Sequence, residues 1–166
     1  MRSHPPRAGR PLPNITDGAI QTSAVASRRR RILVIEDDYS TRHLLEIVLR
    51  ARGYDVASAG DARDGLAILD TRHVDLILLD LVLPGASGID FLRARRDMPP
   101  SVQAPVIVIS ALPELDAIRT ELRYLGAETA IRKPFDVEEL MSALDAHSRR
   151  RVSRARAHPA EVPAQA

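Results

Sequence analysis

A set of side chains suited to phosphoryl chemistry stands at the ends of short apolar runs in this 166-residue chain. They are Glu36, Asp37, Asp38, Asp80, Ser110 and Lys133. Carboxylates gathered in one place repel one another unless a hard divalent cation such as Mg²⁺ shares them. A hydroxyl and an ammonium group suit phosphate oxygens. A carboxylate nucleophile, a metal ion, a hydroxyl and a lysine are together what is needed to move a phosphoryl group onto an aspartate.

Lys133 stands out by residue type. It is the one lysine of the chain, because the other residues among the 24 lysines and arginines are all arginine. A compact ammonium can act as a point charge against a phosphoryl oxygen where a forked guanidinium would not fit. The composition therefore favours a specific role for an ammonium at this position.

The rest of the central chain alternates between short apolar runs and stretches of helical periodicity. This alternation predicts an α/β fold with a doubly wound, five-stranded parallel sheet. Strands are expected over residues 31–36, 54–58, 75–79, 105–109 and 129–132, and helices over 40–52, 62–72, 88–97, 113–125 and 136–148. Runs such as ILVI and VIVI contain no polar alternation, which is typical of strands covered on both faces. Because the carboxyl ends of parallel strands meet at one edge, the polar side chains should share one crevice.

Four segments of the chain, in this order, resemble the receiver domain of two-component response regulators. They are RILVIEDDYSTRHLL, DLILLDLVLPGASGIDFL, PVIVISA and AIRKPFDVEEL, and the resemblance covers about residues 30–148. It implies a flavodoxin-like receiver fold with strand order 2-1-3-4-5. It also implies a single-domain, stand-alone receiver in a two-component phosphorelay, because few residues follow the last motif.

The resemblance assigns roles to individual residues. Asp80 is the implied phosphoacceptor, Ser110 binds a phosphoryl oxygen, and Lys133 reaches the phosphorylated site. The implied Mg²⁺ ligands are Glu36, Asp37, Asp80 and the backbone carbonyl of Val82. Pro134 matches a position that a cis peptide bond precedes in the family.

The resemblance also implies partners. The phosphoryl group would come from a histidine kinase or a histidine phosphotransfer protein. Output would follow from binding an unidentified partner at the face of the fourth helix, fifth strand and fifth helix. Such a protein accepts a phosphoryl group and slowly loses it, and is not a dedicated enzyme.

Three positions bear on how such a receiver would work, namely Ala130, Val82 and Leu112. The first departs from the family pattern. Ala130 stands where the family commonly has an aromatic residue that moves inward on activation, so any signal must pass through backbone and packing changes. Val82 and Leu112 are both apolar. In the family these two positions flank the phosphoryl group, where polar side chains can orient the attacking water. We therefore expect a long-lived phosphorylated form.

The composition of the chain excludes several kinds of site and several classes of protein. The chain has no cysteine, which excludes disulfides, thiolate metal sites and cysteine nucleophiles. No apolar run reaches the roughly 18 residues of a membrane span, so a cytoplasmic protein is expected. Basic residues exceed acidic ones at both ends of the chain, and acidic residues dominate the middle. We expect a disordered Arg- and Pro-containing arm over residues 1–29, the receiver domain over 30–148, and a disordered basic tail over 149–166.

Other interpretations remain open at this point. A transit peptide at the N-terminus is disfavoured by its prolines. A haloacid-dehalogenase-like aspartate phosphohydrolase would share the sheet and Mg²⁺, but its D-x-D motif after the first strand is absent. The arginine-rich tails could bind nucleic acid nonspecifically, although five aromatic residues in the whole chain offer little base stacking.

Several polar residues have simpler structural explanations. Asp38 is explained by the favourable electrostatics of a helix N-terminus. Gly85 and Gly88 fit a turn and a helix entry rather than a phosphate-binding loop. Exposed positions on helices or their ends are expected for the histidines and arginines of the predicted helical segments, namely His43, His73, His147, Arg93, Arg95 and Arg96.

Overall fold

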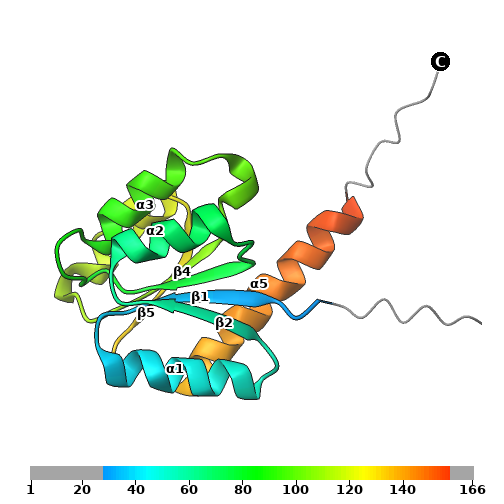
Figure 1. Cartoon of the computed structure of the whole chain (residues 1–166), viewed down its shortest axis with the longest axis horizontal. Helices are drawn as coiled ribbons and strands as arrows, with labels where there is room; N and C mark the ends of the chain where they lie inside the picture. The colour runs from blue at the N-terminus through cyan, green and yellow to red at the C-terminus, as the bar shows by residue number, and fades with distance from the viewer. Residues whose placement is uncertain (1–27, 158–166) are drawn as a thin grey trace, which may run out of the picture.

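The computed structural model describes residues 28–157. Five strands form one parallel sheet in the order β2-β1-β3-β4-β5 (Figure 1). They are β1 (Arg31–Ile35), β2 (Asp55–Ala59), β3 (Leu76–Leu79), β4 (Val106–Ser110) and β5 (Ala127–Arg132). The expected fold class and strand order are therefore confirmed.

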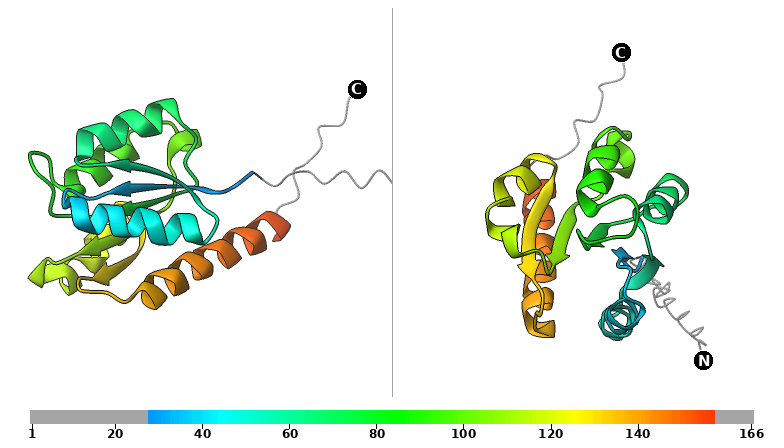
Figure 2. Two further views of the ribbon diagram at one scale, coloured as in Figure 1. Left: turned by 60° about the horizontal axis from the view of Figure 1, so that its bottom comes forward. Right: turned by 90° about the vertical axis from the view of Figure 1, so that its left-hand side faces the viewer.

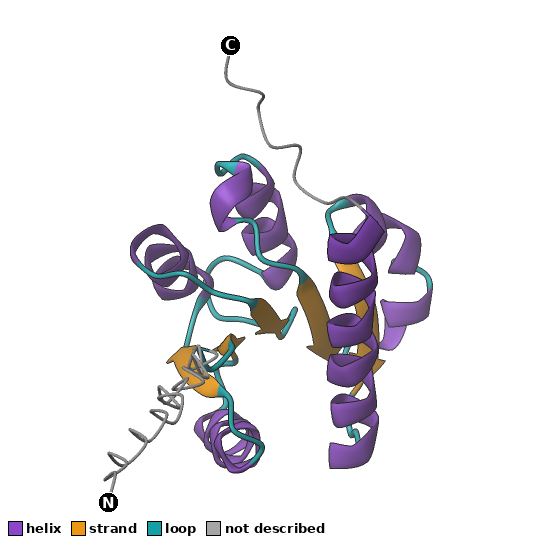
Figure 3. Cartoon of the chain, turned by 90° about the vertical axis from the view of Figure 1, so that its right-hand side faces the viewer, coloured by secondary structure: helices purple, strands orange, loops and turns teal. Residues whose placement is uncertain are grey.

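Helices cover both faces of this sheet (Figure 3). They are α1 (Tyr39–Ala51), α2 (Ala62–Thr71), α3 (Gly88–Arg96), α4 (Arg119–Tyr124) and α5 (Val137–Ala157), with 3₁₀ turns at Pro100–Val102 and Pro113–Asp116. No helix within residues 28–157 combines the length and apolar character needed to cross a membrane.

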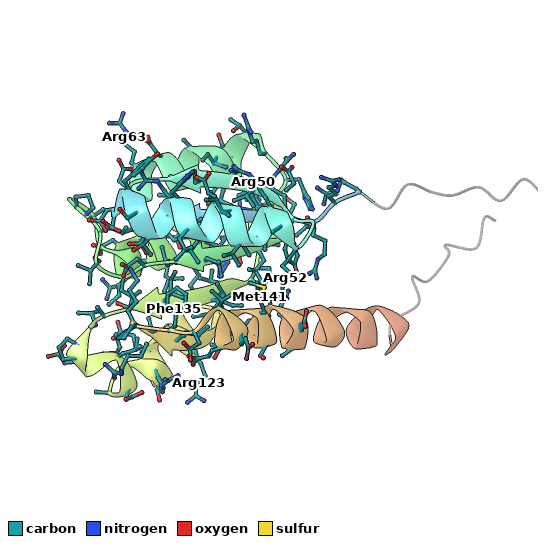
Figure 4. The ribbon with its side chains drawn as sticks, turned by 90° about the horizontal axis from the view of Figure 1, so that it is seen from below. Arg50, Arg52, Arg63, Arg123, Phe135 and Met141 are labelled. Carbon is teal, nitrogen blue, oxygen red and sulfur yellow. The ribbon has the colours of Figure 1, made fainter. Side chains whose placement is uncertain are left out.

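Each face of the sheet has its own apolar core. Adjacent strand residues point to opposite faces, so Leu33 and Ile35 of β1 pack with side chains of α2, α3 and α4. Ile32 and Val34 pack with side chains of α1 and α5 on the other face. Met141 of α5 belongs to this second core, and Figure 4 shows it on the side of the helix that faces the sheet. The strands are therefore held from both sides, which gives their carboxyl ends a rigid support.

The prediction of one helix over 113–125 is wrong in its first half. Residues Pro113–Asp116 form a 3₁₀ turn, and α4 begins only at Arg119. The carboxylate of Asp116 accepts hydrogen bonds from Arg119 Nε at 2.7 Å and from Arg132 Nη2 at 2.9 Å. The Leu115 N–H bonds to the carbonyl three residues earlier, as in 3₁₀ structure. These contacts hold the segment in a tighter turn than an α-helix.

The predicted helix over 136–148 is too short at its C-terminal end. Helix α5 continues to Ala157, so residues 149–157 are helical rather than the start of a disordered tail. No glycine or proline interrupts residues 137–157, and arginines are good helix formers that are favourable near a helix C-terminus. Figure 2 shows the end of α5 running past the edge of the sheet. Residues 1–27 and 158–166 of the expected arm and tail lie outside the described residues.

Two polar side chains expected at the surface are buried. His147 is 4% exposed, and its Nδ1 lies 2.5 Å from Glu128 Oε2. Arg95 is 5% exposed and donates to the backbone carbonyl of Gly126 at 3.3 Å. The other residues of that group are exposed as predicted, namely His43, His73, Arg93 and Arg96. The two buried side chains bind partners on another element: His147 contacts Glu128 of β5, and Arg95 contacts Gly126 just before that strand. Helical periodicity alone does not predict such contacts.

Asp75 anchors the segment that leads into β1. Its carboxylate accepts two hydrogen bonds from Arg28 Nη2, at 3.0 and 2.9 Å, and one from the Arg31 backbone N–H at 2.8 Å. His73 Nε2 lies 3.2 Å from the same carboxylate. Burial alone raises the pKa of Asp75, but these hydrogen bonds and the charge of Arg28 outweigh it and leave the pKa lowered.

Candidate functional site

The candidate site lies at the carboxyl edge of the sheet. The chain enters β1 at one end of the molecule, and the loops that follow the strands gather at the other end (Figure 1). Glu36 follows β1, Asp80 follows β3, and Lys133 follows β5. Ser110 is the last residue of β4. The parallel topology therefore brings together residues that are far apart in the sequence.

Three acidic side chains converge at this edge. Glu36, Asp37 and Asp80 each offer a carboxylate oxygen, and these oxygens lie within 4.8 Å of one another. Two oxygens bound to one octahedral Mg²⁺ are separated by at most about 4.2 Å, because each Mg–O bond is about 2.1 Å. Glu36 and Asp80 are buried, whereas Asp37 is exposed. The donor set and its spacing fit Mg²⁺ after a small adjustment, with the exposed side left for water.

Lys133 bridges two of these acids. Its Nζ lies 2.6 Å from Glu36 Oε2 and 2.5 Å from Asp80 Oδ2. Burial raises the pKa of Glu36, and the hydrogen bond and charge of Lys133 offset only part of this effect. Burial lowers the pKa of Lys133, but its bonds to Asp80 and Glu36 outweigh that and leave the pKa raised. The lysine is therefore a charged group that partly compensates a crowded acidic site.

Backbone contacts orient Asp80. The Val82 N–H donates to Asp80 Oδ1 at 2.9 Å. Gly88, the first residue of α3, donates its N–H to the carbonyl of Leu81 at 3.0 Å. A Cβ at Gly88 would lie 2.3 Å from the Asp80 carbonyl oxygen, so any side chain there would force the backbone to move. Gly88 thus serves as a helix entry, and the small residue lets α3 begin directly against Asp80.

Ser110 and Lys133 are connected through the backbone. The Lys133 N–H donates to the Ser110 carbonyl at 2.9 Å. The Ser110 side chain is buried, and its hydroxyl accepts the Leu112 N–H at 3.3 Å. The Lys133–Pro134 peptide bond is cis, as the resemblance implied. These contacts place the hydroxyl-bearing strand end beside the loop that carries the lysine.

Position 130 carries alanine rather than an aromatic residue, and a backbone contact and a cavity lie beside it. Arg119 of α4 donates from Nη1 to the Ala130 carbonyl at 2.9 Å. A cavity of about 130 Å³ lies here, lined in part by Leu122, Ala127 and Ala130. Arg119 therefore links α4 directly to the backbone of β5.

Near the acidic loop, one residue has the role that the sequence predicted and another has a role that was not predicted. Asp38 is the N-cap of α1 and accepts the Thr41 N–H at 2.7 Å, as its helix-terminal explanation required. Arg42 was not predicted to take part in the site, yet it donates to the backbone carbonyls of Glu36 and Asp37. Its position six residues after Glu36, in the first turns of a helix, is the signal that could have identified it.

Comparison with known proteins identifies the family. Residues 32–145 match the family model described as the response regulator receiver domain. The chain is 38% identical over 122 residues to the DNA-binding response regulator MtrA of Mycobacterium tuberculosis, which covers 74% of this chain and 52% of MtrA. It is 36% identical over 114 residues to the sporulation initiation phosphotransferase F of Bacillus subtilis, covering 69% of this chain and 90% of that protein. The chain thus spans about half the length of MtrA.

Solved structures show the same architecture. The signal receiver domain of the LuxO repressor protein from Vibrio parahaemolyticus aligns with a TM-score of 0.70 at 26% identity, covering 80% of this chain and 99% of that one. Chemotaxis response regulator CheY4 of Vibrio cholerae aligns with a TM-score of 0.65 at 26% identity, covering 71% and 98%. These matches do not support a haloacid-dehalogenase-like phosphohydrolase or a nucleic-acid-binding function of the tails. From its fold, its site and these similarities, the chain belongs to the response regulator receiver domain family.

Proposed function

We propose that this receiver accepts a phosphoryl group on Asp80 in a two-component phosphorelay. The observation that carries the proposal is the convergence of Asp80 with Glu36, Asp37 and Lys133 at one sheet edge. An oxygen of Asp80 would attack the phosphorus of a phosphohistidine, forming a P–O bond as the P–N bond breaks and the imidazole leaves. Asp80 is held for this step by the Val82 N–H.

The residues around Asp80 have complementary roles in the proposal. Glu36, Asp37, Asp80 and the backbone carbonyl of Val82 would hold Mg²⁺, which neutralises charge between the carboxylates and the phosphoryl oxygens when bound. Lys133 would exchange its contact with Asp80 for one with a phosphoryl oxygen. Ser110 would donate its hydroxyl to another phosphoryl oxygen. A relative that is 27% identical, the response regulator TrrA of Thermotoga maritima, was solved in complex with Mg²⁺ and BeF.

The partners belong to the same proposal. The donor would be a histidine kinase or a histidine phosphotransfer protein in the cytoplasm, and the output partner would bind the face formed by α4, β5 and α5. Because Ala130 lacks an aromatic ring, the change would reach that face through the Arg119 contact with the Ala130 carbonyl and the turn around Asp116. Slow loss of the phosphoryl group would then return the protein to its starting state without a dedicated hydrolase activity.

Intact-mass measurement tests the acceptor assignment. The protein would be incubated with a small acyl-phosphate donor and Mg²⁺, beside Asp80→Asn and the matched control Asp70→Asn on the exposed end of α2. We expect one phosphoryl addition in the wild type and in Asp70→Asn, and none in Asp80→Asn. A phosphoryl addition that persists in Asp80→Asn would place the acceptor elsewhere.

A further inference from the structure

Arg42 makes a contact that links helix α1 to the loop carrying two of the acids. Its Nη1 donates to the carbonyl of Glu36 at 2.5 Å and to the carbonyl of Asp37 at 3.0 Å. The guanidinium carbon lies 5.6 Å from the centre of the Tyr39 ring. A Cβ at Gly60 would lie 3.7 Å from Nη1, which is ordinary contact. Arg42 therefore sits between α1, the acidic loop and the loop after β2.

These two carbonyls cannot find donors in the helix. The first carbonyl that α1 uses belongs to Asp38, which accepts the Arg42 N–H at 2.9 Å. Glu36 and Asp37 precede this N-cap, so the helical hydrogen-bond pattern does not extend to them. The bond to the Glu36 carbonyl is partly buried, where a backbone carbonyl needs a partner, whereas the bond to the Asp37 carbonyl is exposed. The Arg42 side chain supplies a hydrogen-bond donor to both carbonyls.

The direction of a peptide carbonyl is coupled to the direction of the neighbouring side chains, because only two backbone torsions per residue are free to rotate. Holding both carbonyls on one guanidinium therefore restricts the directions in which the side chains of Glu36 and Asp37 leave the backbone. Without this contact the loop could relax and separate the negatively charged groups, which repel one another. The contact keeps them converged on Asp80.

We propose that Arg42 is a positioning residue that preorganises Glu36 and Asp37 for Mg²⁺. The inference rests on the proposed function of this acidic cluster. Groups that orient metal ligands without touching the metal typically change affinity by 10–100-fold when substituted. A second effect has the opposite sign, since a guanidinium near the site repels a divalent cation. Because Nη1 is engaged with both carbonyls of the loop and the charge of Asp38 opposes that of Arg42, we expect positioning to outweigh repulsion.

The test is calorimetric titration of Mg²⁺ into the unphosphorylated full chain. The variants are Arg42→Met, which removes the charge and the donors, and Arg42→Lys, which keeps the charge but has a side chain one atom too short to place its nitrogen where Nη1 lies. The matched control is Arg63→Met, an exposed arginine of α2 that points away from the domain in Figure 4. We expect Arg42→Met to weaken Mg²⁺ binding by about tenfold, Arg42→Lys to weaken it less, and Arg63→Met to leave it unchanged.

Unchanged or tighter Mg²⁺ binding in Arg42→Met would overturn the inference, as would a loss confined to thermal stability. If Arg42→Met does not fold, unchanged affinity in Arg42→Lys counts against the inference and weakened affinity supports it. The phosphorylation rate of Arg42→Met should recover at saturating Mg²⁺, because the reacting groups are intact. Failure of the wild type to bind Mg²⁺, or insensitivity of that binding to Asp37→Ala, would instead reject the proposed metal site itself.

Discussion

The ammonium of Lys133 lies 2.5 Å from Oδ2 of Asp80, across 53 positions of the sequence. The same Nζ reaches Glu36 at 2.6 Å. One cation thus connects the ends of β1, β3 and β5, and its side chain is 18% exposed. The single ammonium nitrogen lies within hydrogen-bond distance of both buried carboxylates, as a compact point charge can.

Replacing Lys133 with arginine tests this relationship. The guanidinium keeps the charge but substitutes a wide fork for a point donor, so we expect Lys133→Arg to fold while phosphorylation, or its effect on partner binding, fails. Intact mass after treatment with an acyl-phosphate donor and the thermal unfolding midpoint measure the two properties. The control is Arg72→Lys, at an exposed position directly after α2. Normal phosphorylation and partner binding by Lys133→Arg would contradict the point-charge role.

Mg²⁺ should stabilise the fold by mass action. A ligand at ten times its dissociation constant adds about 1.4 kcal/mol to the free energy of unfolding. We expect millimolar Mg²⁺ to raise the unfolding midpoint of the wild type and not that of Asp37→Ala. Asp70→Ala, which removes an exposed acid far from the cluster, should behave like the wild type. Coincident midpoints with and without Mg²⁺ would show that the site is misassigned.

Asp75 should give the unfolding free energy a dependence on acid pH. Its pKa is lowered in the folded state from an ordinary value of 3.8. A carboxyl with a lowered folded pKa contributes stability that is fully present above its unfolded pKa and is lost as the pH falls through the folded pKa. We therefore expect this contribution to be constant from neutral pH to about pH 5 and to fall below about pH 4.

The variant Asp75→Asn isolates that contribution. It removes the ionic partner of Arg28, and we expect it to lower the free energy of unfolding by about 2 kcal/mol at pH 7. Denaturant unfolding between pH 3 and pH 7 would compare it with Asp70→Asn, whose carboxylate is exposed on α2. The difference between wild type and Asp75→Asn should shrink at the acid end. A difference that is independent of pH would count against the ionised form of Asp75 as the stabilising one.

The apolar residues Val82 and Leu112 should prolong the lifetime of the aspartyl phosphate. Val82 is 51% exposed beside Asp80, and its side chain offers no hydrogen bond to hold water in line for attack. Introducing Val82→Asn with Leu112→Glu should shorten the lifetime about tenfold if it restores about 1.4 kcal/mol of water positioning. The measurement is decay of the phosphorylated protein after the donor is removed.

Leu112 is half-buried against the core, so its replacement also needs a stability control. Val82→Asn alone, at the exposed position, should produce part of the acceleration without a change in the unfolding midpoint. Unchanged or slower decay in both variants would refute the argument from water positioning.

The chain ends can be tested by truncation. Removing residues 1–27 and 158–166 keeps the pair formed by Arg28 and Asp75, and we expect phosphorylation to remain intact. The removed segments contain three arginines, Arg2, Arg7 and Arg10, whereas the arginines at 28–31 and 149–156 stay, so we expect any salt-sensitive association with nucleic acid or anionic surfaces to be largely retained. Loss of phosphorylation on trimming would show that these ends belong to the fold.

The apolar runs by themselves determined the sheet, because a strand covered on both faces has a local signature that needs no knowledge of its neighbours. Since such strands are parallel, the same pattern placed Glu36, Asp80 and Lys133 at one edge, and the converging side chains agree with it. Residue type then singled out Lys133 as the ammonium. These conclusions depend on periodicity and order along the chain, which the sequence contains in full.

The tertiary structure determined the remaining contacts, because long side chains bind partners on other elements and no local sequence pattern identifies those partners. Asp116 interrupts a predicted helix by bonding to Arg132 of β5, and Glu128 of that strand draws His147 into the interior. Each of these contacts depends on the distance between elements after the sheet has assembled, and that distance is a property of packing rather than of sequence spacing.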